Sequence, residues 1–342
     1  MALQLYNTLT RNKEPLKTHE EGRARVYVCG PTVYDYAHLG HARSCIAYDV
    51  LVRHLRATGW TVDYVRNITD IDDKIIKRSK ETGEEPAKLA EQFTKAYHDD
   101  MHRLQCIDPD VEPKVSDNLD AIVELVQRLI DKGHAYEADG DVYFDVQSFE
   151  GYGKLSHRNL DELAAGASGR TTDEESQRKR HPADFALWKK SPEDEPGWDS
   201  PWSRGRPGWH IECSAMSMRH LGESFDVHGG GLDLVFPHHE NEIAQSEAAT
   251  NKTFATMWVH NGFVEVDKQK MSKSLGNFFT VRELFERFEP EAIRYVMLTR
   301  HYRAPLNLDW TIDDEGNITG FPQFEEAEHR LEYLYSTRRR LE

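Results

Sequence analysis

The 342-residue sequence is poor in cysteine and contains no long apolar run. Its four cysteines are too few for a disulfide scaffold, so we expect free or metal-bound thiols in a reducing cytoplasm. No stretch approaches the roughly 18 apolar residues that span a bilayer, and the first residues lack the basic and apolar regions of a secretory signal. We therefore expect a cytoplasmic globular protein with no membrane partner.

Positive charge is also scarce, because 43 Lys and Arg face 59 Asp and Glu, for a net charge of −16. Nucleic-acid phosphates are bound mainly by Lys and Arg, so this composition argues against a general affinity for nucleic acid. Any RNA partner must be bound by local groups of cations. The composition is otherwise ordinary, with 38% hydrophobic residues, and the length predicts about two domains.

Two common nucleotide-binding loops are absent as well. Neither the G-x-G-x-x-G fingerprint nor the G-x-x-x-x-G-K-[ST] loop occurs in the sequence. The sequence also shows no internal repeat and no low-complexity tract. A nucleotide site in this chain must therefore be built from other residues.

The first ordered pattern predicts a strand, a helix and a second strand. The run 23–29 (RARVYVC) is rich in β-formers and stops at Gly30, and the second β-rich run is 60–65 (WTVDYV). Between them a helix begins near residue 41, ends at a glycine at position 59, and carries one apolar face formed by Ile46, Val50, Leu51 and Leu55. This βαβ unit predicts an α/β fold with a parallel sheet and ligand sites at the carboxyl ends of its strands.

The rest of the chain divides into an insertion, a second half of the α/β core and a helical end. Helical patterns occupy 85–105 and 117–132, and the insertion then holds a short β piece at 142–146, a polar loop at 164–181 and a Pro/Gly/Trp-rich segment at 191–208. The core resumes near residue 208, with a strand at 224–228 and a helix at 241–249. The final third is predicted as helices at 281–288, 291–299 and 323–341, with a loop at 311–322.

Two histidines bracket a glycine at the start of the first helix. The residues after the first strand, PTVYDYAHLGH, end in His38, Gly40 and His41. A helix N-terminus offers unpaired N–H groups and a positive dipole end to phosphates, imidazoles can donate to phosphate oxygens, and a glycine lets a nucleotide approach the backbone. Taken alone, the pattern is weak and favours surface or capping histidines over a phosphate site.

A second motif, KMSKSLGN, places Lys270 and Lys273 beside small hydroxyl residues in a glycine-terminated loop. Such a cationic arm could close over a triphosphate and neutralise the charge that builds on departing pyrophosphate. Taken alone, it also fits a solvated basic loop in front of the helix at 281. The joint occurrence of both motifs on opposite sides of an insertion is much more specific.

Together these motifs resemble the HIGH and KMSKS motifs of class I aminoacyl-tRNA synthetases, and the surrounding sequence is similar to cysteinyl-tRNA synthetases in particular. The resemblance runs from about residue 5 to 307, with Leu39 in place of the common isoleucine. It implies an α/β fold with a Rossmann-like parallel sheet, an inserted connective domain and a helical C-terminal segment. It rests on VCGPTVYD at 28–35, NITDIDDK at 67–74, GWHIECSAM at 208–216, HGGGLDL at 228–234, FPHHENE at 236–242 and KMSKS at 270–274.

On this resemblance we expect five segments. They are the first half of the catalytic core (1–107), the connective insertion (108–206), the second half of the core (207–265), the KMSKS loop with a stem-contact segment (266–310) and the start of a helical region (311–342). The family generally continues into a helical anticodon-binding domain that this sequence lacks for the most part. We therefore expect a fragment or a naturally short form, and a chain that binds tRNA weakly.

The resemblance also implies a zinc site. Cys29, Cys213, His238 and Glu242 fall at the positions of the family's zinc ligands, and His238 and Glu242, four residues apart, share one helical face. Two thiolates, an imidazole and a carboxylate form a plausible Zn²⁺ set. Without the resemblance, core cysteines and a charged helix cap would explain the same residues. The remaining thiols, Cys45 and Cys106, match no metal position and are expected to be inert.

The implied reaction is the ATP-dependent activation of L-cysteine and its transfer to tRNA(Cys). One zinc ion per chain would select the cysteine thiol, in a pocket lined by Thr69, Trp209 and His228. The catalytic residues would be His38, His41, Lys270 and Lys273. ATP would be bound by His38, Gly40, His41 and Lys273, and Mg²⁺ would accompany the phosphates. We expect a monomer.

Two other functions compete with this one. The first is a mycothiol-type ligase that joins activated cysteine to an amino-sugar, a related family that departs from this sequence at Glu242. The second is a non-catalytic zinc- and RNA-binding module derived from a synthetase. Such a module has no need to keep both nucleotide motifs and the zinc positions, so the sequence favours the synthetase.

Overall fold

The computed structural model describes residues 3–160, 162, 177–270, 278–312, 315 and 318–342. It divides into two compact units. The first unit comprises Met1–Tyr34, Leu55–Glu91 and Pro109–Val259, and the second comprises Asp35–His54, Gln92–Asp108 and His260–Glu342.

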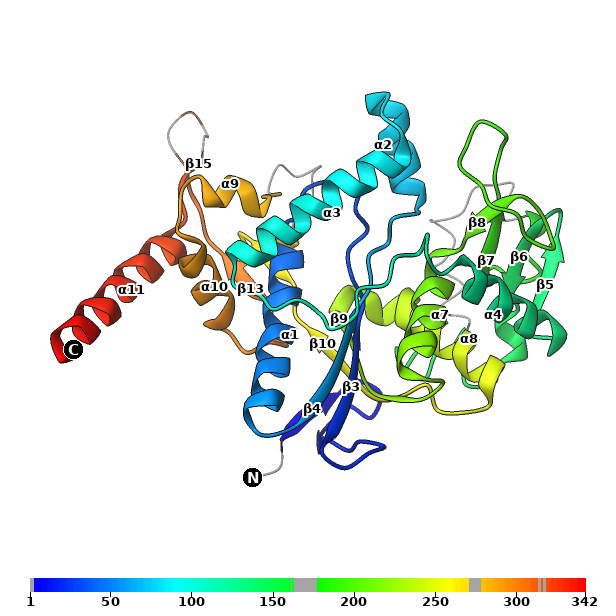
Figure 1. The fold of residues 1–342 in the computed structure, drawn as a ribbon, viewed down its shortest axis with the longest axis horizontal. Helices are drawn as coiled ribbons and strands as arrows, with labels where there is room; N and C mark the ends of the chain where they lie inside the picture. Colours follow the sequence, from blue (N-terminus) through cyan, green and yellow to red (C-terminus); the bar gives the residue numbers. More distant parts are fainter. Residues whose placement is uncertain (1–2, 161, 163–176, 271–277, 313–314, 316–317) are drawn as a thin grey trace. The chain divides into compact units, whose positions relative to one another are not determined.

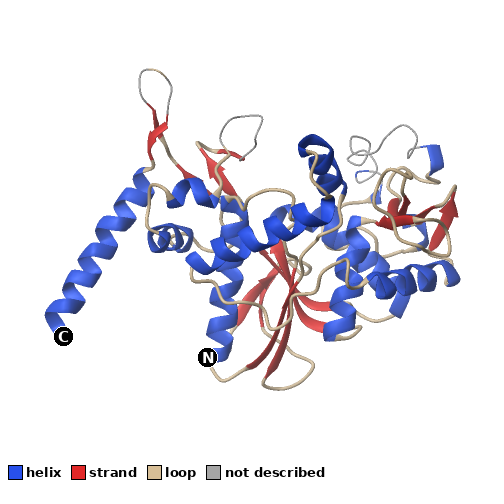
Figure 2. Ribbon diagram, turned by 45° about the horizontal axis from the view of Figure 1, so that its top comes forward, coloured by secondary structure: helices blue, strands red, loops and turns tan. Residues whose placement is uncertain are grey.

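A four-stranded sheet forms the centre of the first unit (Figures 1 and 2). Its order is β10-β9-β3-β4, and β3 runs parallel to both of its neighbours. The carboxyl end of β3 lies beside that of β9, where Val28 pairs with Gly229. The predicted parallel α/β sheet is therefore confirmed. Its strands are β3 (Arg23–Val28), β4 (Thr61–Arg66), β9 (Phe225–Gly231) and β10 (Ala255–Asn261).

The sequence of these strands explains why they pair in this way. Val26, Tyr27 and Val28 are all buried, and every residue of β9 except the last is buried. Strands covered on both faces read as continuous apolar runs rather than as alternating ones, which is typical of parallel sheets. Three glycines end β9, and the last two, Gly230 and Gly231, lie close to side chains of the segment that follows.

Four strands between residues 135 and 207 form a second, antiparallel sheet in the same unit. Its strands are β5 (Ala135–Ala138), β6 (Asp141–Phe144), β7 (Phe185–Lys190) and β8 (Gly205–Pro207), in that order. Beside it in Figure 1, helix α4 packs against two helices of the second core half. These helices are α4 (Leu119–Asp131), α7 (Trp209–Leu221) and α8 (Glu240–Thr250). Phe144, Leu187 and Trp188 are fully buried in the shared core.

The second unit holds most of α1 (Leu39–Ala57) and α3 (Pro86–Arg103) together with the C-terminal elements. Asp49 is buried and accepts hydrogen bonds from Arg53, Arg294 and the backbone N–H of Ile107, so one carboxylate joins three segments. The remaining elements are β11 (Val264–Val266), β12 (Gln269–Lys270), α9 (Val281–Phe285), α10 (Pro290–Leu298), β13 (Leu306–Leu308) and α11 (Pro322–Leu341).

Three details differ from the sequence-based expectations. Val50, expected on the apolar face of α1, is 41% exposed, and Val52 is fully buried instead. The segment expected as a loop at 311–322 contains a small antiparallel pair, β14 (Thr311–Ile312) with β15 (Ile318–Gly320). An additional helix, α2 (Asp73–Thr82), begins where Asp72 accepts the N–H of Lys74 and ends at a left-handed glycine.

Two further points concern the predicted loop and the membrane. Most of the polar stretch predicted as a loop at 164–181 lies outside the described residues. Across the parts of the chain that the structure describes, no helix combines the length and the apolar character needed to cross a membrane.

Candidate active site

Two cysteines far apart in the sequence meet at the carboxyl end of β3. Cys29 follows the strand directly, and Cys213 lies in the second turn of α7. Their sulfur atoms are 3.7 Å apart, and both side chains are buried. The backbone N–H of Cys29 donates to the carbonyl of Gly229, which fixes this residue against β9.

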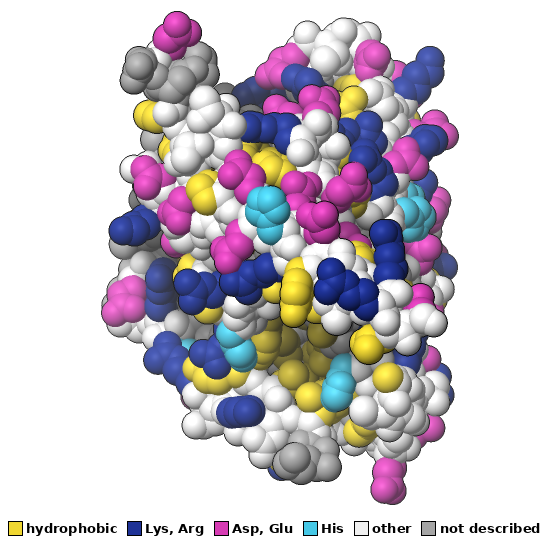
Figure 3. Space-filling model, turned by 90° about the vertical axis from the view of Figure 1, so that its left-hand side faces the viewer, with side chains coloured by type: hydrophobic (Ala, Val, Ile, Leu, Met, Phe, Trp, Pro, Cys, Tyr) yellow, Lys and Arg dark blue, Asp and Glu magenta, His cyan; other side chains and the backbone are white. Residues whose placement is uncertain are grey.

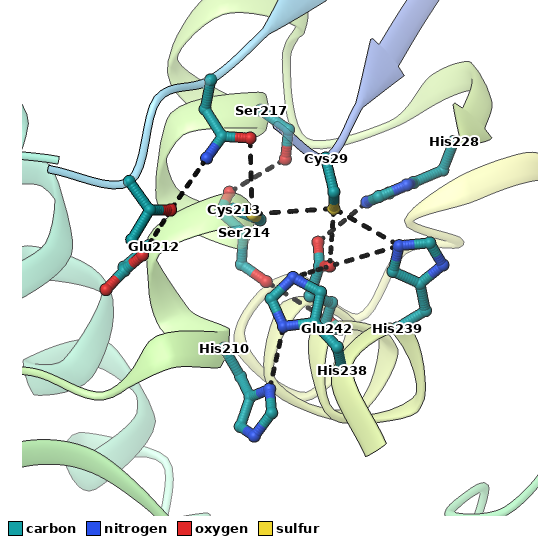
Figure 4. A network of polar contacts seen from close by, with 12 residues as sticks. Cys29, His210, Glu212, Cys213, Ser214, Ser217, His228, His238, His239 and Glu242 are labelled. Carbon is teal, nitrogen blue, oxygen red and sulfur yellow. Dashed lines mark hydrogen bonds and ion pairs between the residues drawn. The ribbon is translucent and has the colours of Figure 1, made fainter. Parts of the chain in front are cut away.

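His238 and Glu242 complete the cluster from the segment that leads into α8 (Figure 4). A cis peptide joins Phe236 to Pro237, and the chain then turns into the helix. Glu242 Oε1 lies 3.1 Å from His238 Nε2 and 3.5 Å from Cys29 Sγ. One atom from each of Cys29, Cys213, His238 and Glu242 lies within 4.8 Å of the others. The structure therefore brings together all four residues that the sequence singles out as a zinc set.

The donor set suits Zn²⁺ by its chemistry and its spacing. Sulfur, imidazole nitrogen and carboxylate oxygen are the ligands that this ion prefers, and bonds of 2.0–2.3 Å in a tetrahedron place neighbouring donors about 3.3–3.8 Å apart. The 3.5 and 3.7 Å separations from Cys29 fall in this range. Glu242 is fully buried, and burying a carboxylate is costly unless a cation or hydrogen bonds compensate it.

Protonation in the cluster is set by burial and by the neighbouring thiols. The Cys29 thiol donates a hydrogen bond to Cys213, which lowers the pKa of Cys213, while burial raises the pKa of Cys29 well above its usual value. Burial also lowers the pKa of His238 and keeps its imidazole neutral. A neutral imidazole and an ionised thiol are the forms that bind metal.

Neighbouring side chains orient the cluster. His228 lies 2.8 Å from the second oxygen of Glu242, and His210 Nδ1 lies 3.0 Å from His238 Nδ1. The Trp209 ring stacks on His238 with centroids 4.3 Å apart. Outer contacts of this kind fix the tautomer and ring orientation of a metal-binding histidine.

Two other residues of the same FPHHENE stretch tie the helix to the connective insertion. The Glu240 carboxylate is fully buried and accepts the backbone N–H groups of Gly153, Leu155 and Ser156 at 3.0, 3.3 and 2.7 Å. Asn241 accepts the Tyr152 hydroxyl at 2.6 Å. Sequence reasoning missed this role, because a buried carboxylate inside a motif resembles a ligand until its partners are known.

The predicted pocket residues lie beside the cluster in the first unit. Thr69 is buried and donates its hydroxyl to Glu212 at 3.2 Å, whereas Trp209 is 37% exposed. His228 is fully buried, with its ring stacked on Trp258. Burial raises the pKa of Glu212 well above its usual value, and the neighbouring Cys213 adds to the effect. Sequence reasoning did not single out Glu212, although it lies between Trp209 and Cys213 in the GWHIECSAM stretch.

The histidine–glycine motif lies in the second unit at the start of α1. The rings of His38 and His41 stack with centroids 3.8 Å apart, and His38 Nδ1 accepts the N–H of Gly40 at 3.0 Å. A Cβ atom at Gly40 would lie 2.8 Å from His38 Cε1. The glycine is therefore needed to seat the His38 ring, whatever else approaches the backbone here.

Residues 278–280, which follow the KMSKS motif in the sequence, pair with this motif. Leu39 donates its N–H to the carbonyl of Phe279, and His38 forms an isolated antiparallel bridge with Thr280. The ring of Phe278 meets His38 edge-on at 5.3 Å. Lys270 ends β12, opposite Glu265, and Lys273 lies outside the described residues.

Comparison with solved structures defines the class of fold. Mycobacterium tuberculosis methionyl-tRNA synthetase in complex with methionyl-adenylate superimposes with a TM-score of 0.65 at 17% identity, over 86% of this chain and 67% of that one. A putative arginyl-tRNA synthetase from Campylobacter jejuni gives 0.54 at 12% identity, over 86% and 66%. The fold is that of class I synthetases.

Sequence comparison is more specific. The family described as "tRNA synthetases class I (C) catalytic domain" matches residues 15–314, and this chain belongs to it. Cysteine–tRNA ligases from Syntrophotalea carbinolica and Pyrococcus abyssi are 54% and 57% identical over 96% and 90% of this chain. The chain spans 67% and 64% of the length of these two relatives. The predicted family is confirmed.

Proposed function

We propose that this chain activates L-cysteine with ATP and transfers it to tRNA(Cys). The observation that carries the proposal is the buried cluster of Cys29, Cys213, His238 and Glu242, which offers two sulfur atoms to a soft metal beside a candidate amino-acid pocket. The 54% identity to the Syntrophotalea carbinolica cysteine–tRNA ligase supports the same substrate. The setting is the cytoplasm, and the chain acts as a monomer.

Cysteine selection follows from the donor set. Bound Zn²⁺ would offer a direct bond to the substrate thiolate, which the harder and less acidic hydroxyl of serine cannot match. Thr69, Trp209 and His228 would hold the rest of the amino acid. A substrate such as serine that cannot form the metal bond is rejected by a larger factor than a hydrophobic pocket can reach. No editing site is therefore required.

The first chemical step needs alignment rather than a protein nucleophile. A carboxylate oxygen of cysteine attacks the α-phosphorus of ATP, the bond to the bridging oxygen breaks, and pyrophosphate leaves. His38, Gly40 and His41 would bind the triphosphate with Mg²⁺, and Lys270 and Lys273 would stabilise the charge on the leaving group. In the second step the terminal ribose hydroxyl of tRNA attacks the acyl carbon, and AMP leaves.

ATP–pyrophosphate exchange tests the first step directly. Purified chain should exchange pyrophosphate into ATP with cysteine and not with serine, and it should contain one zinc ion per chain. Absence of cysteine-dependent exchange in zinc-loaded protein would overturn the proposal. Charging of tRNA(Cys) is tested separately with the same preparation. We expect tRNA binding to weaken as the salt concentration rises, because it must depend on phosphate contacts from local groups of Lys and Arg.

A further inference from the structure

The metal cluster contains more donors than one tetrahedral ion can use. A second group of four, formed by Cys29, His228, His239 and Glu242, also has one donor atom from each residue within 4.8 Å of the others. The two groups share Cys29 and Glu242. Figure 4 shows His228 and His239 reaching these shared residues from the side away from Cys213.

The distances around His239 are those of a ligand. Its Nε2 atom lies 3.3 Å from Cys29 Sγ and 3.9 Å from Glu242 Oε1, close to the roughly 3.3–3.8 Å that separates donors around tetrahedral zinc. His228 Nε2 lies 2.8 Å from the other oxygen of Glu242. Both imidazoles are fully buried.

Gly230 leaves room for the His239 ring. A Cβ atom on Gly230 would lie 2.9 Å from His239 Cε1 and 3.1 Å from His239 Nε2. Because the same Cβ atom would also lie 2.9 Å from Leu234 Cδ1, a larger residue at this position would force the His239 ring or Leu234 to move. On the other side Trp258 packs against both imidazoles, with ring centroids 4.4 Å from His228 and 5.3 Å from His239.

We propose that this cluster holds a divalent zinc-type ion at two overlapping positions, with His239 and His228 replacing Cys213 and His238 as ligands at the second. The ion keeps its bonds to Cys29 and Glu242 throughout, because both positions use them. The first position presents two thiolates and the second presents one. This inference rests on the metal site of the proposed function and adds a second ligand set to it.

A double-mutant cycle on Cys213 and His239 tests the proposal. Zinc affinity is measured by competition with a chromophoric chelator for the wild type, Cys213→Ala, His239→Ala and the double variant. If His239 contacts Cys29 without binding the metal, the His239→Ala change lowers the zinc affinity by the same factor in both backgrounds. If it is an alternative ligand, we expect a loss below about 10-fold in the wild-type background and above about 100-fold in the Cys213→Ala background. His220→Ala, an exposed histidine on the same α7, serves as the control.

Cobalt substitution supplies a second readout that does not depend on activity. The sulfur-to-cobalt charge-transfer absorption should fall from that of two thiolates to that of one in Cys213→Ala, with the ion retained. Gly230→Ala in this background should then release the ion by displacing His239. Equal effects of His239→Ala in both backgrounds, or complete loss of cobalt from Cys213→Ala, would overturn the second position.

The outcomes separate this inference from the function that it builds on. Zinc-free wild-type protein would contradict the metal site itself, whereas a zinc-loaded wild type with an uncoupled cycle would contradict only the second position. If Cys213→Ala does not fold, Cys213→Ser, which nearly preserves the volume, takes its place in the cycle.

Discussion

Replacing Glu240 by alanine is expected to lower the stability of the chain strongly, although this residue is not proposed as a ligand. Its buried carboxylate accepts three backbone N–H groups of the loop at Gly153–Ser156. Hydrogen bonds to a charged acceptor contribute about 1.5–3 kcal/mol each, and each buried N–H left without a partner costs about 1–3 kcal/mol. Because a water molecule can replace part of the carboxylate, we expect Glu240→Ala to lower the free energy of unfolding by about 3–5 kcal/mol.

The two oxygens of Glu240 make a graded version of this experiment possible. One oxygen accepts from Gly153 and Leu155, and the other accepts from Ser156. Glutamine keeps one acceptor and turns the other position into an N–H₂ group that faces a donor. Glu240→Gln should therefore cost about half as much as Glu240→Ala, roughly 2 kcal/mol.

Urea unfolding of zinc-loaded protein, followed by tryptophan fluorescence and circular dichroism, measures these changes. Glu137→Gln alters an exposed glutamate of β5 in the same unit and should stay within about 0.5 kcal/mol of the wild type. The Glu240 variants should also bind zinc more weakly, because the loop at Gly153–Ser156 no longer holds the first turn of α8. Stability of Glu240→Ala within about 1 kcal/mol of the wild type would refute the assignment of this carboxylate as a structural acceptor.

Three further outcomes are expected. Cys29→Ser, which removes a donor shared by both groups, should leave purified protein without stoichiometric zinc, as measured by atomic absorption. Lys273→Ala should retain zinc but lower cysteine-dependent pyrophosphate exchange by about 100-fold or more; unchanged exchange would exclude its role. Burial outweighs the ion pair with Arg282 and raises the pKa of Asp100 to about 6. The folded chain therefore holds this proton to higher pH than the unfolded chain, and stability falls as pH rises from 5 to 7. In Asp100→Asn, the decrease in the free energy of unfolding between pH 5 and pH 7 should be smaller than in the wild type by about 1 kcal/mol. Urea unfolding at the two pH values measures this difference.

The sequence predicts the fold well where the buried face of an element is purely apolar. The runs at 23–29 and 60–65 are rich in β-formers, and each strand ends in three consecutive buried residues, because the sheet is covered on both faces there. Glycine marks the end of the first helix. Val50 was misplaced because the buried face of α1 is not purely apolar. Asp49 occupies part of that face to bind Arg294, and apolar periodicity has no means of placing a buried carboxylate. Helix α2 was missed because its start depends on the Asp72 cap rather than on an apolar stripe.

In the candidate active site, the spacing of residues that share one helical face identified some residues and missed others. Spacing by four placed His238 and Glu242 on one face, and the structure brings them within 3.1 Å. The same rule pairs residues three apart, so His239 could also have been placed beside Glu242. The contacts of Glu240 could not have been found, because they are made with backbone groups about 85 positions away that no side-chain pattern marks.

The acidic composition weighs less against an RNA partner than the net charge suggests. Asp49, Asp226, Glu240 and Glu242 are buried, and their charges are matched by backbone N–H groups, arginines or the candidate metal site rather than displayed to solvent. Among the described residues, eight carboxylates but only two arginines and no lysine are buried, so the surface is less negative than −16. Figure 3 shows Lys and Arg interspersed with Asp and Glu over one face. Phosphate binding depends on where such cations gather, and the composition alone therefore does not set the affinity for tRNA.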